Sequence, residues 1–338
     1  MKVGILRRAN RPDFIFKPVV VFAQHLEVDV FYFSPKDVDL ENKTINGYFL
    51  QEGTWKKKTT SYPDVIDIHT GNRPLKKWIE YFDNYCTFTT HPVGKKTEVF
   101  KKIKEKEWAK ELIIPYERTR DFASFQVFLT THKKIIIKPA GGNQGKNVHK
   151  IEQLADGKIE MSSDNANWIF TMAEFQEYYQ QNFENKSFML QKYIHSMTKE
   201  GIPYDIRIQV RKDDENKWAL VKIYPRIGLG NKITSNIHTG GGVAKIVSFI
   251  HMLYPERYQE IMKNLKHLAF QIPREFERLY PYDFDALGID LGLDEQGDPY
   301  LFEINASPGS EFCKAEAAFY RAQYYKYLCK KHKESLNE

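Results

Sequence analysis

The chain has 338 residues, of which 42% are hydrophobic and 28% are charged, enough for two or three packed subdomains around a substantial core. Its formal net charge of +6 comes from 50 basic and 44 acidic residues spread along the sequence. This balance argues against a dedicated nucleic-acid-binding protein and is more typical of a protein with a local anion site.

The sequence also argues against a membrane partner. No run of about 18 apolar residues occurs, and the segment MKVGILRRAN lacks the apolar stretch of a signal peptide. The three cysteines, Cys86, Cys313 and Cys329, are widely spaced and form no CxxC pair, so they indicate neither a disulfide framework nor a zinc site. We therefore expect a cytoplasmic location.

The first 90 residues have the pattern of a small α/β domain. Strands are predicted at 2–6 (KVGIL) and 28–33 (VDVFYF), with a helix through 19–24 between them. The next segment is turn-rich, and a further short strand is predicted at 64–70. Alternating lysines and glutamates then indicate an exposed helix from Lys95 to Glu111.

A strand at 133–140 (KKIIIKPA) leads into the glycine-rich turn GGNQGK, and VHKI at 148–151 returns as its hairpin partner. Thr171 and Glu174 form a capping-box pattern that predicts a helix to about Phe183. A strand follows at 187–194.

Two antiparallel hairpins are predicted in the second half of the chain. The first joins 204–210 to 218–224, and the second joins 287–293 to 300–305. The chain closes with a predicted helix from Lys314 onward.

The last hairpin carries two carboxylates and an amide. Glu303 and Asn305 are two residues apart, so both project from one face of the strand, whereas Phe302 and Ile304 project from the other. Asp290 lies on the partner strand within reach. These oxygens suit Mg²⁺ held jointly with phosphate, although a hairpin with solvent-facing acids would give the same pattern.

The earlier hairpin places positive charge in the same way. Alternation puts two polar sets on one surface: Asp205, Arg207 and Gln209 on the first strand, and Lys222, Tyr224 and Arg226 on the second. Guanidinium groups suit phosphate and carboxylate oxygens and can stabilise charge on a transferring phosphoryl group. A solvated surface hairpin would show the same alternation.

The third feature is a lysine followed by glycines. Lys138 leaves an apolar strand, and the turn with Gly141, Gly142 and Gly145 follows at once. A point charge and unhindered backbone N–H groups can hold a polyphosphate. The order differs from that of a Walker loop, and an ordinary glycine hairpin is the alternative.

Taken together and in this order, the motifs resemble the ATP-grasp superfamily. The resemblance covers roughly residues 90–312 and is carried by six segments: IIIKPAGGNQGK, FMLQKYI, DIRIQV, YPRIG, SNIHTGGG and GIDLGLDEQGDPYLFEINASPG. Within the superfamily the sequence most resembles the bacterial YheC/YheD family of spore-coat-associated proteins, with RimK-type and glutathione-synthetase-type ligases as neighbours.

The resemblance implies a mixed α/β (α+β) architecture, the ATP-grasp fold. An N-terminal α/β domain is expected at 1–90, preceding the ATP-grasp part. A linker helix and an ATP-lid subdomain are expected at 91–190. The C-terminal ATP-grasp core, an antiparallel sheet with the metal site, is expected at 191–338.

The resemblance also implies a role for each matching residue. ATP contacts are implied for Lys96 (or Lys95), Lys138, Gly141, Gly142, Gly145, Gln191, Lys192, Tyr193, Ile194 and Lys222. The backbones of Lys192 and Ile194 would meet the edge of the adenine. Arg207, Arg226 and Asn236 would face the γ-phosphate and the acyl phosphate. Asp290, Glu303 and Asn305 would hold two Mg²⁺ ions, or Mn²⁺ in their place, with Glu303 bridging. The family loop usually ends in a glycine where this chain has Asn147, a residue type that tolerates unusual backbone angles.

The implied activity is an ATP- and Mg²⁺-dependent carboxylate–amine ligation through an acyl phosphate, with release of ADP. Two alternatives stay open: a spore-coat-associated protein that binds nucleotide without catalysis, and an ATP-grasp phosphotransferase. The intact set Asp290, Glu303 and Asn305 argues against the first. No motif identifies the carboxylate or amine substrate, whether amino acid, peptide or protein tail, or the oligomeric state. The family adds spore association to the expected location.

Overall fold

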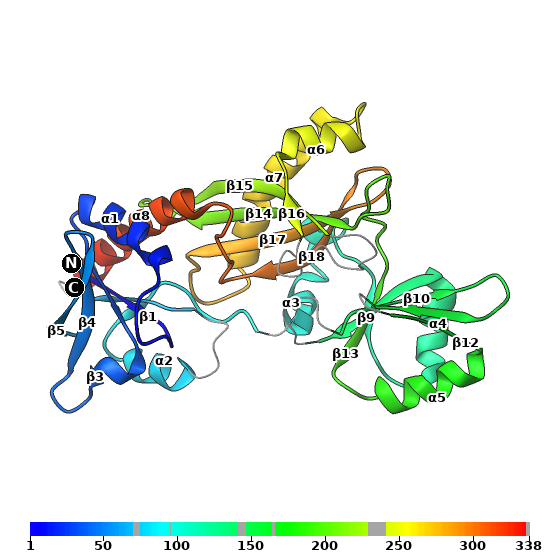
Figure 1. The fold of residues 1–338 in the computed structure, drawn as a ribbon, viewed down its shortest axis with the longest axis horizontal. Helices are drawn as coiled ribbons and strands as arrows, with labels where there is room; N and C mark the ends of the chain where they lie inside the picture. The colour runs from blue at the N-terminus through cyan, green and yellow to red at the C-terminus, as the bar shows by residue number, and fades with distance from the viewer. Residues whose placement is uncertain (70–74, 95, 141–146, 164–165, 229–240, 336–338) are drawn as a thin grey trace.

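The computed structural model describes residues 1–69, 75–94, 96–140, 147–163, 166–228 and 241–335, and the statements below concern these residues. Three β-sheets follow one another along the long axis of the molecule (Figure 1). The N-terminal sheet lies at one end, a five-stranded sheet lies in the middle, and a six-stranded sheet lies at the other end. The mixed α/β fold predicted from the sequence is confirmed.

The N-terminal sheet has seven strands in the order β3-β4-β2-β1-β6-β7, with β5 paired to β4. Four of them, β1, β2, β6 and β7, are parallel, and the others are antiparallel to their neighbours. The strands are β1 (Lys2–Leu6), β2 (Asp29–Phe33), β3 (Val38–Asp39), β4 (Thr44–Gln51), β5 (Thr54–Ser61), β6 (Val65–Asp67) and β7 (Thr87–Phe88). The hairpin β4–β5 was missed because β5 (TWKKKTTS) is largely exposed and lysine-rich, which removes the hydrophobic alternation that signals a strand.

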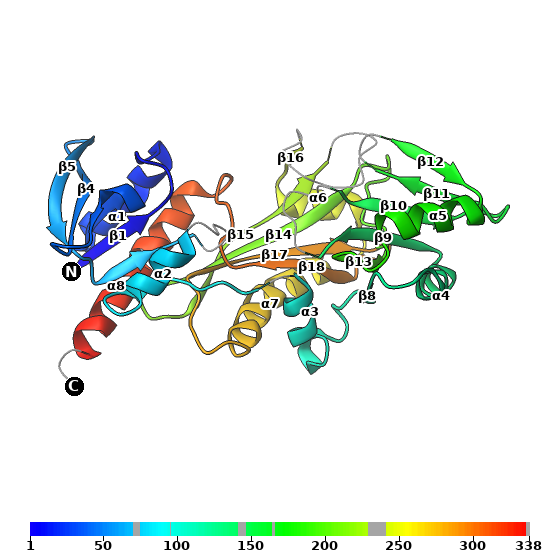
Figure 2. The same ribbon diagram turned by 90° about the horizontal axis from the view of Figure 1, so that it is seen from below.

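Helices cover both faces of this sheet. After the 3-10 turn η1 (Phe14–Phe16), α1 (Lys17–His25) packs on one face together with the C-terminal helix α8 (Lys314–Ser335). The short helix α2 (Lys76–Phe82) contributes Phe82 to a separate cluster on the other face. Figure 2 shows α8 crossing from the middle sheet to the N-terminal sheet, so the two ends of the chain share one hydrophobic core.

The linker helix α3 (Lys96–Ile103) is shorter than predicted and is followed by the 3-10 turn η4 (Glu107–Ala109). The expectation that it is an exposed helix was wrong in part. Val99, Phe100 and Ile103 are buried in the core of the middle sheet, and the charged residues supply only its outer face.

The six-stranded sheet has the order β12-β11-β10-β9-β13-β8. Its strands are β8 (Tyr116–Arg118), β9 (Lys134–Pro139), β10 (His149–Gln153), β11 (Ile159–Ser162), β12 (Asn167–Phe170) and β13 (Phe188–Lys192). Helices α4 (Phe122–His132) and α5 (Met172–Asn182) pack against one face through an aromatic cluster. The predicted capping box is confirmed, because the Thr171 hydroxyl and the Glu174 carboxylate each bond the other's backbone N–H.

The middle sheet has the order β16-β15-β14-β17-β18 and contains both predicted hairpins. Its strands are β14 (Tyr204–Lys212), β15 (Trp218–Ile227), β16 (Gly242–Val243), β17 (Ala286–Leu293) and β18 (Pro299–Asn305). One face is apolar and packs on α6 (Ile246–Leu253) and α7 (Tyr258–Glu277). The other face carries the polar residues of the candidate site.

Within the described ranges, no helix combines the length and the apolar character needed to span a bilayer. The domain boundaries at residues 90 and 190 stay a prediction. Helix α8 was expected in the C-terminal unit, residues 191–338, but it also packs on the sheet of the N-terminal unit.

Candidate active site

Strand register gathers the predicted site residues on the polar face of the middle sheet. Asp290 of β17 is directly opposite Arg207 of β14 on one side and Glu303 of β18 on the other. Arg226 of β15 is opposite Asp205. Residues directly opposite one another in a ladder project from the same face, so the predicted convergence of acids and arginines is present.

The two arginines share one buried carboxylate. Asp290 accepts from Arg207 Nε, from Arg207 Nη2 at 3.0 Å and from Arg226 Nη2 at 2.8 Å. Arg226 also binds Asp205 through Nε at 2.6 Å and Nη2 at 2.7 Å. Burial opposes the charge on Asp290, but both arginines outweigh it and hold the pKa of this carboxyl below its usual value. Two guanidiniums are thus fixed side by side on this face, and their contact with a phosphoryl group stays a prediction.

Two lysines approach this face from other elements. Lys96 at the start of α3 lies 3.0 Å from Glu303, measured between Nζ and Oε2. Lys138 of β9 donates to Gln191 Oε1 at 2.6 Å. Burial, and then the charge of Lys96, lower the pKa of Lys138 to about 7, although Glu303 opposes this shift. Lys96 of the linker therefore pairs with an acid of the middle sheet, and Lys138 of the six-stranded sheet lies near enough for both charges to act on it.

The predicted adenine-binding segment lies at the end of β13. Lys192 N–H donates to Pro115 O at 2.9 Å and Tyr193 N–H donates to Lys134 O at 3.0 Å. The Lys192 N–H is therefore occupied, so only the carbonyl of this residue could meet a base edge. Among the described residues, Ile194 N–H has no backbone acceptor, and its contact with the adenine stays a prediction. The side-chain Nε2 of Gln191 is buried and also has no partner in that part of the chain.

One predicted nucleotide contact is already paired with another segment, and four lie outside the described residues. Lys222 is on the polar face, but its Nζ donates to the Phe312 carbonyl at 2.8 Å. Four predicted contacts lie outside the described residues: Gly141, Gly142, Gly145 and Asn236. Asn147, at the end of the glycine-rich turn, has a φ of 57°, so the asparagine occupies the left-handed region in which a glycine would be at ease.

Strand alternation alone could not predict two contacts on this face, those of Gly288 and of Phe302. A Cβ on Gly288 would lie 3.0 Å from Arg207 Nη1 and 2.7 Å from Pro308 Cβ, so glycine is needed for the close approach of this arginine. The β17–β18 register shifts between Asp290 and Leu291, and the Phe302 ring packs over Gly292. The prediction that Phe302 projects away from Glu303 was wrong, because this bulge turns the ring onto the face of Asp290. Phe302 is a candidate for contact with a base that sequence reasoning missed.

The acids suit a metal ion that takes some of its ligands from phosphate and water better than one held by protein groups alone. Among the described residues, no group of three or more His, Cys, Asp and Glu side chains is placed to hold a metal ion. Glu303 is the accessible acid, with 25% of its side chain exposed against 7% for Asp290. Glu303 and Asn305 share a strand face and offer oxygen atoms only, which suits Mg²⁺ that takes its remaining ligands from phosphate and water.

A family model described as YheC/D like ATP-grasp matches residues 85–332. The chain belongs to the YheC/D-like ATP-grasp family. The endospore coat-associated protein YheD of Bacillus subtilis (strain 168) is 23% identical over 321 residues, which is 91% of this chain and 70% of that protein. The resemblance inferred from the six sequence segments is thereby confirmed.

Solved structures agree with this fold. A RiPP-associated ATP-grasp ligase from Chryseobacterium gregarium, in complex with ADP and a leader and core peptide, superposes with a TM-score of 0.52 at 13% identity, covering 98% of this chain and 97% of that one. D-alanine–D-alanine ligase from Bacillus anthracis gives 0.54 at 10% identity, covering 99% of each chain. For this YheC/D-like chain the two structures establish the ATP-grasp fold.

Proposed function

We propose that this YheC/D-like protein is an ADP-forming carboxylate–amine ligase that uses Mg²⁺-ATP. The observation that carries the proposal is the convergence of Lys96 and Lys138 with Arg207, Arg226 and Glu303 from three separate parts of the fold. Positively charged groups around a carboxylate suit phosphoryl transfer, in which positioning and charge stabilisation supply most of the rate.

In the proposed reaction, a substrate carboxylate oxygen attacks the γ-phosphorus of ATP. The bond to the bridging oxygen breaks, ADP leaves, and an acyl phosphate forms. An amine nitrogen then attacks the acyl carbon, inorganic phosphate leaves, and the nitrogen loses a proton. Arg207 and Arg226 would bind the transferring phosphoryl group through their planar donor sets, and Lys138 would bind the phosphates of ATP.

Mg²⁺ would be held by Glu303 and Asn305, with Asp290 beside them, and when bound it would neutralise phosphate charge. Phe302 and the segment Gln191–Ile194 would bind the adenine. A nucleophilic side chain is not required in this chemistry, which agrees with a site built from cations and metal ligands.

For the substrates we propose a class of molecule and not a single compound. We propose an amino acid, peptide or protein tail for the carboxylate and amine, in a protein of the cytoplasm that is associated with the spore coat. The name of YheD supports the spore association, and the peptide-bound RiPP-associated ligase supports a peptide substrate.

A product screen tests the proposal. Purified protein with Mg²⁺-ATP is incubated with pooled amino acids and peptides, and mass spectrometry detects conjugates that have lost one water relative to their substrates. ADP and phosphate are quantified in the same samples, with Lys138→Ala as the inactive control. Conjugates with stoichiometric ADP are expected. Nucleotide binding without any conjugate or phosphorylated product would favour the non-catalytic alternative, and a stable phosphorylated product would favour a phosphotransferase.

A further inference from the structure

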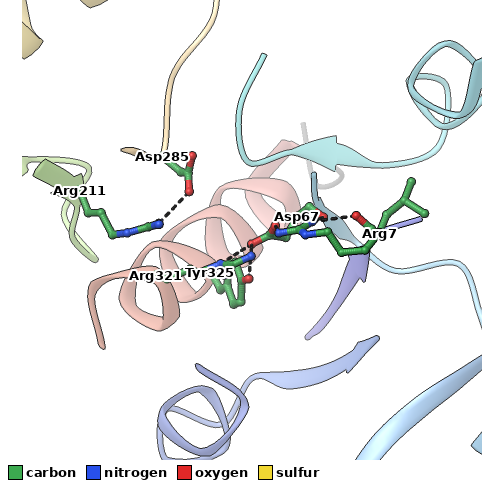
Figure 3. Close-up of polar contacts among 7 residues, drawn as sticks. Arg7, Asp67, Arg211, Asp285, Arg321 and Tyr325 are labelled. Carbon is green, nitrogen blue, oxygen red and sulfur yellow. Dashed lines mark hydrogen bonds and ion pairs between the residues drawn. The ribbon is translucent and has the colours of Figure 1, made fainter. Parts of the chain in front are cut away.

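The charged side chains at the end of β6 bind one another. Arg7 Nη2 lies 2.6 Å from Asp67 Oδ1, and Arg321 Nε donates to Asp67 Oδ2 at 2.6 Å. The Tyr325 hydroxyl donates to the same Oδ2 (Figure 3). These bonds hold α8 against the end of β6, so this cluster has a structural role.

A second group of charges, beside β8, is not paired in this way. Among the described residues, the side chains of Lys104, Glu117 and Arg118 form no ion pair, and all three residues are exposed. They lie at one edge of the six-stranded sheet, because β8 has β13 on one side only. This edge therefore offers charges of both signs to a partner.

The backbone of β8 offers hydrogen-bonding groups at the same edge. The Pro115 carbonyl and the Thr119 N–H both bond to the segment that contains β13. Because such bonds alternate along an antiparallel strand, Tyr116 and Arg118 direct their backbone N–H and C=O groups away from β13. In the part of the chain that the structure describes, no strand pairs with this side of β8. An extended segment from another molecule can therefore form a ladder here.

A pocket of about 290 Å³ lies against this edge. Its lining includes Pro115 and Glu117 from the edge and Val127 and Phe128 from α4. Glu117 is directly opposite Leu190, which packs on α4, so Pro115 and Glu117 project from the face of the sheet that α4 covers. A strand added beside β8 would project every second side chain from this face, into the pocket.

The hydrophobic layer between the sheet and α4 is incomplete at the pocket. Under the inner strands, Ile137 and Leu190 fill this layer. At β8 the equivalent position is occupied by the exposed acid Glu117, and Val127 of α4 is 68% exposed. An apolar side chain on an added strand would continue the layer and cover Val127, which favours an apolar residue at that position.

We propose that the edge of β8 binds an extended peptide segment as a seventh strand of this sheet, with an apolar side chain in the pocket and acidic side chains beside it. The ladder would supply affinity, and the pocket would select the side chain. Two of the three unpaired charges, Lys104 and Arg118, are positive, and opposite charges on neighbouring strands attract. The partner is therefore a peptide segment in which an apolar residue is flanked by acids.

This peptide site is separate from the proposed nucleotide site. Strand β9 places Ile137 on the face covered by α4 and Lys138 on the opposite face. The proposal therefore does not depend on the ligase reaction, and binding of a peptide can be measured with or without Mg²⁺-ADP.

A capped heptapeptide with a central leucine, a glutamate on each side of it and threonine elsewhere is the probe. Its binding to the full-length protein is measured by calorimetry, and we expect saturable binding of one peptide per chain. Replacing the leucine with aspartate should weaken binding at least tenfold. With the leucine in register with Glu117, the backbone N–H groups of both flanking glutamates face β8 and that of the leucine faces away.

Methylation of the peptide backbone separates a ladder from a simple apolar contact. N-methylation of the two glutamates should weaken binding at least tenfold, whereas N-methylation of the leucine alone should change it less than twofold. Equal effects of the two modifications, or no binding of the unmodified peptide, would overturn the proposal. These measurements need no protein variant.

The matching variant is Val127→Glu, which places a charge at the apolar wall of the pocket. We expect at least tenfold weaker peptide binding with unchanged Mg²⁺-ADP affinity. Val247→Glu is the control, because Val247 of α6 is also an exposed valine, at 53%, and should tolerate the charge without loss of peptide binding. Wild-type peptide affinity in Val127→Glu contradicts the proposal. So does sedimentation that shows a wild-type dimer and a Val127→Glu monomer, because the edge would then join two copies of this chain.

Discussion

Lys138 provides the sharpest test of the nucleotide site, because its charge depends on pH in the physiological range. Burial and the charge of Lys96 lower the pKa of Lys138 to about 7. Phosphate oxygens would favour the charged form and return the pKa toward the roughly 10.4 of a free lysine. ATP should therefore bind with uptake of a proton wherever the free protein holds this lysine neutral.

The magnitude follows from the two pKa values. At about pH 8 roughly nine-tenths of Lys138 would be neutral in the free protein, so about 0.9 proton should be taken up per ATP. Between pH 7 and pH 9 the affinity should fall by about fiftyfold, since each pH unit above the pKa costs about 1.4 kcal/mol.

Calorimetry in buffers of different ionisation enthalpy measures the proton uptake directly. Lys138→Arg is the control, because arginine stays charged and its ATP affinity should not change over this range. Equal apparent enthalpies in all buffers for wild type at about pH 8 would refute the reasoning. The stability of the fold should also depend on pH through Lys138, and it should rise with pH above about pH 7. The unfolded chain binds the extra proton between pH 7 and about pH 10, so this lysine destabilises the nucleotide-free fold fully below pH 7 and less as pH rises.

Three further predictions concern the acids and the products. Glu303→Gln should lower turnover by about a hundredfold or more in steady-state assays, because the metal loses a charged ligand. The melting temperature should change little, because the fold loses only a partly exposed ion pair. Full turnover in this variant would contradict the prediction. Asp290→Ala should lower the free energy of unfolding by about 3–5 kcal/mol in urea titrations, because the buried Arg207 and the partly buried Arg226 lose their shared acid. Glu215→Ala, at an exposed residue, is its control, and equal midpoints for both variants would contradict the prediction. Turnover should release ADP and phosphate, because Arg207 and Arg226 are proposed to bind the γ-phosphoryl group. Stoichiometric pyrophosphate in an enzyme-coupled assay would contradict this.

Strand alternation was enough to predict the polar face of the middle sheet. Arg207, Asp290 and Glu303 stand on three neighbouring strands, and the period of two residues fixes the face on which each side chain lies. The polar turns at 213–216 (DDEN) and 294–299 (DEQGDP) indicated which strands form hairpins. Both signals are local, which is why the sequence carried them without knowledge of the tertiary structure.

The features that sequence reasoning missed depend on contacts between distant segments. Nothing in the sequence of β18 shows that a bulge turns Phe302 onto Gly292, because a bulge is a property of the strand pair. The salt bridge between Asp67 and Arg321 joins residues 254 positions apart. The helical pattern of α8 predicted a helix, but it did not predict that this helix packs on the N-terminal sheet.

The ion pairs of the candidate site give a physical reason for ATP and its metal to bind together under the proposed function. The accessible acid, Glu303, is paired with Lys96, and the buried acid, Asp290, is paired with two arginines. ATP alone would compete with these acids for the cations and leave the acids unpaired. Mg²⁺ alone would take Glu303 and leave Lys96 without its partner. When both enter, the metal can replace Lys96 at Glu303 while phosphate oxygens replace Glu303 at Lys96, so each charge exchanges one partner for another and none is left uncompensated.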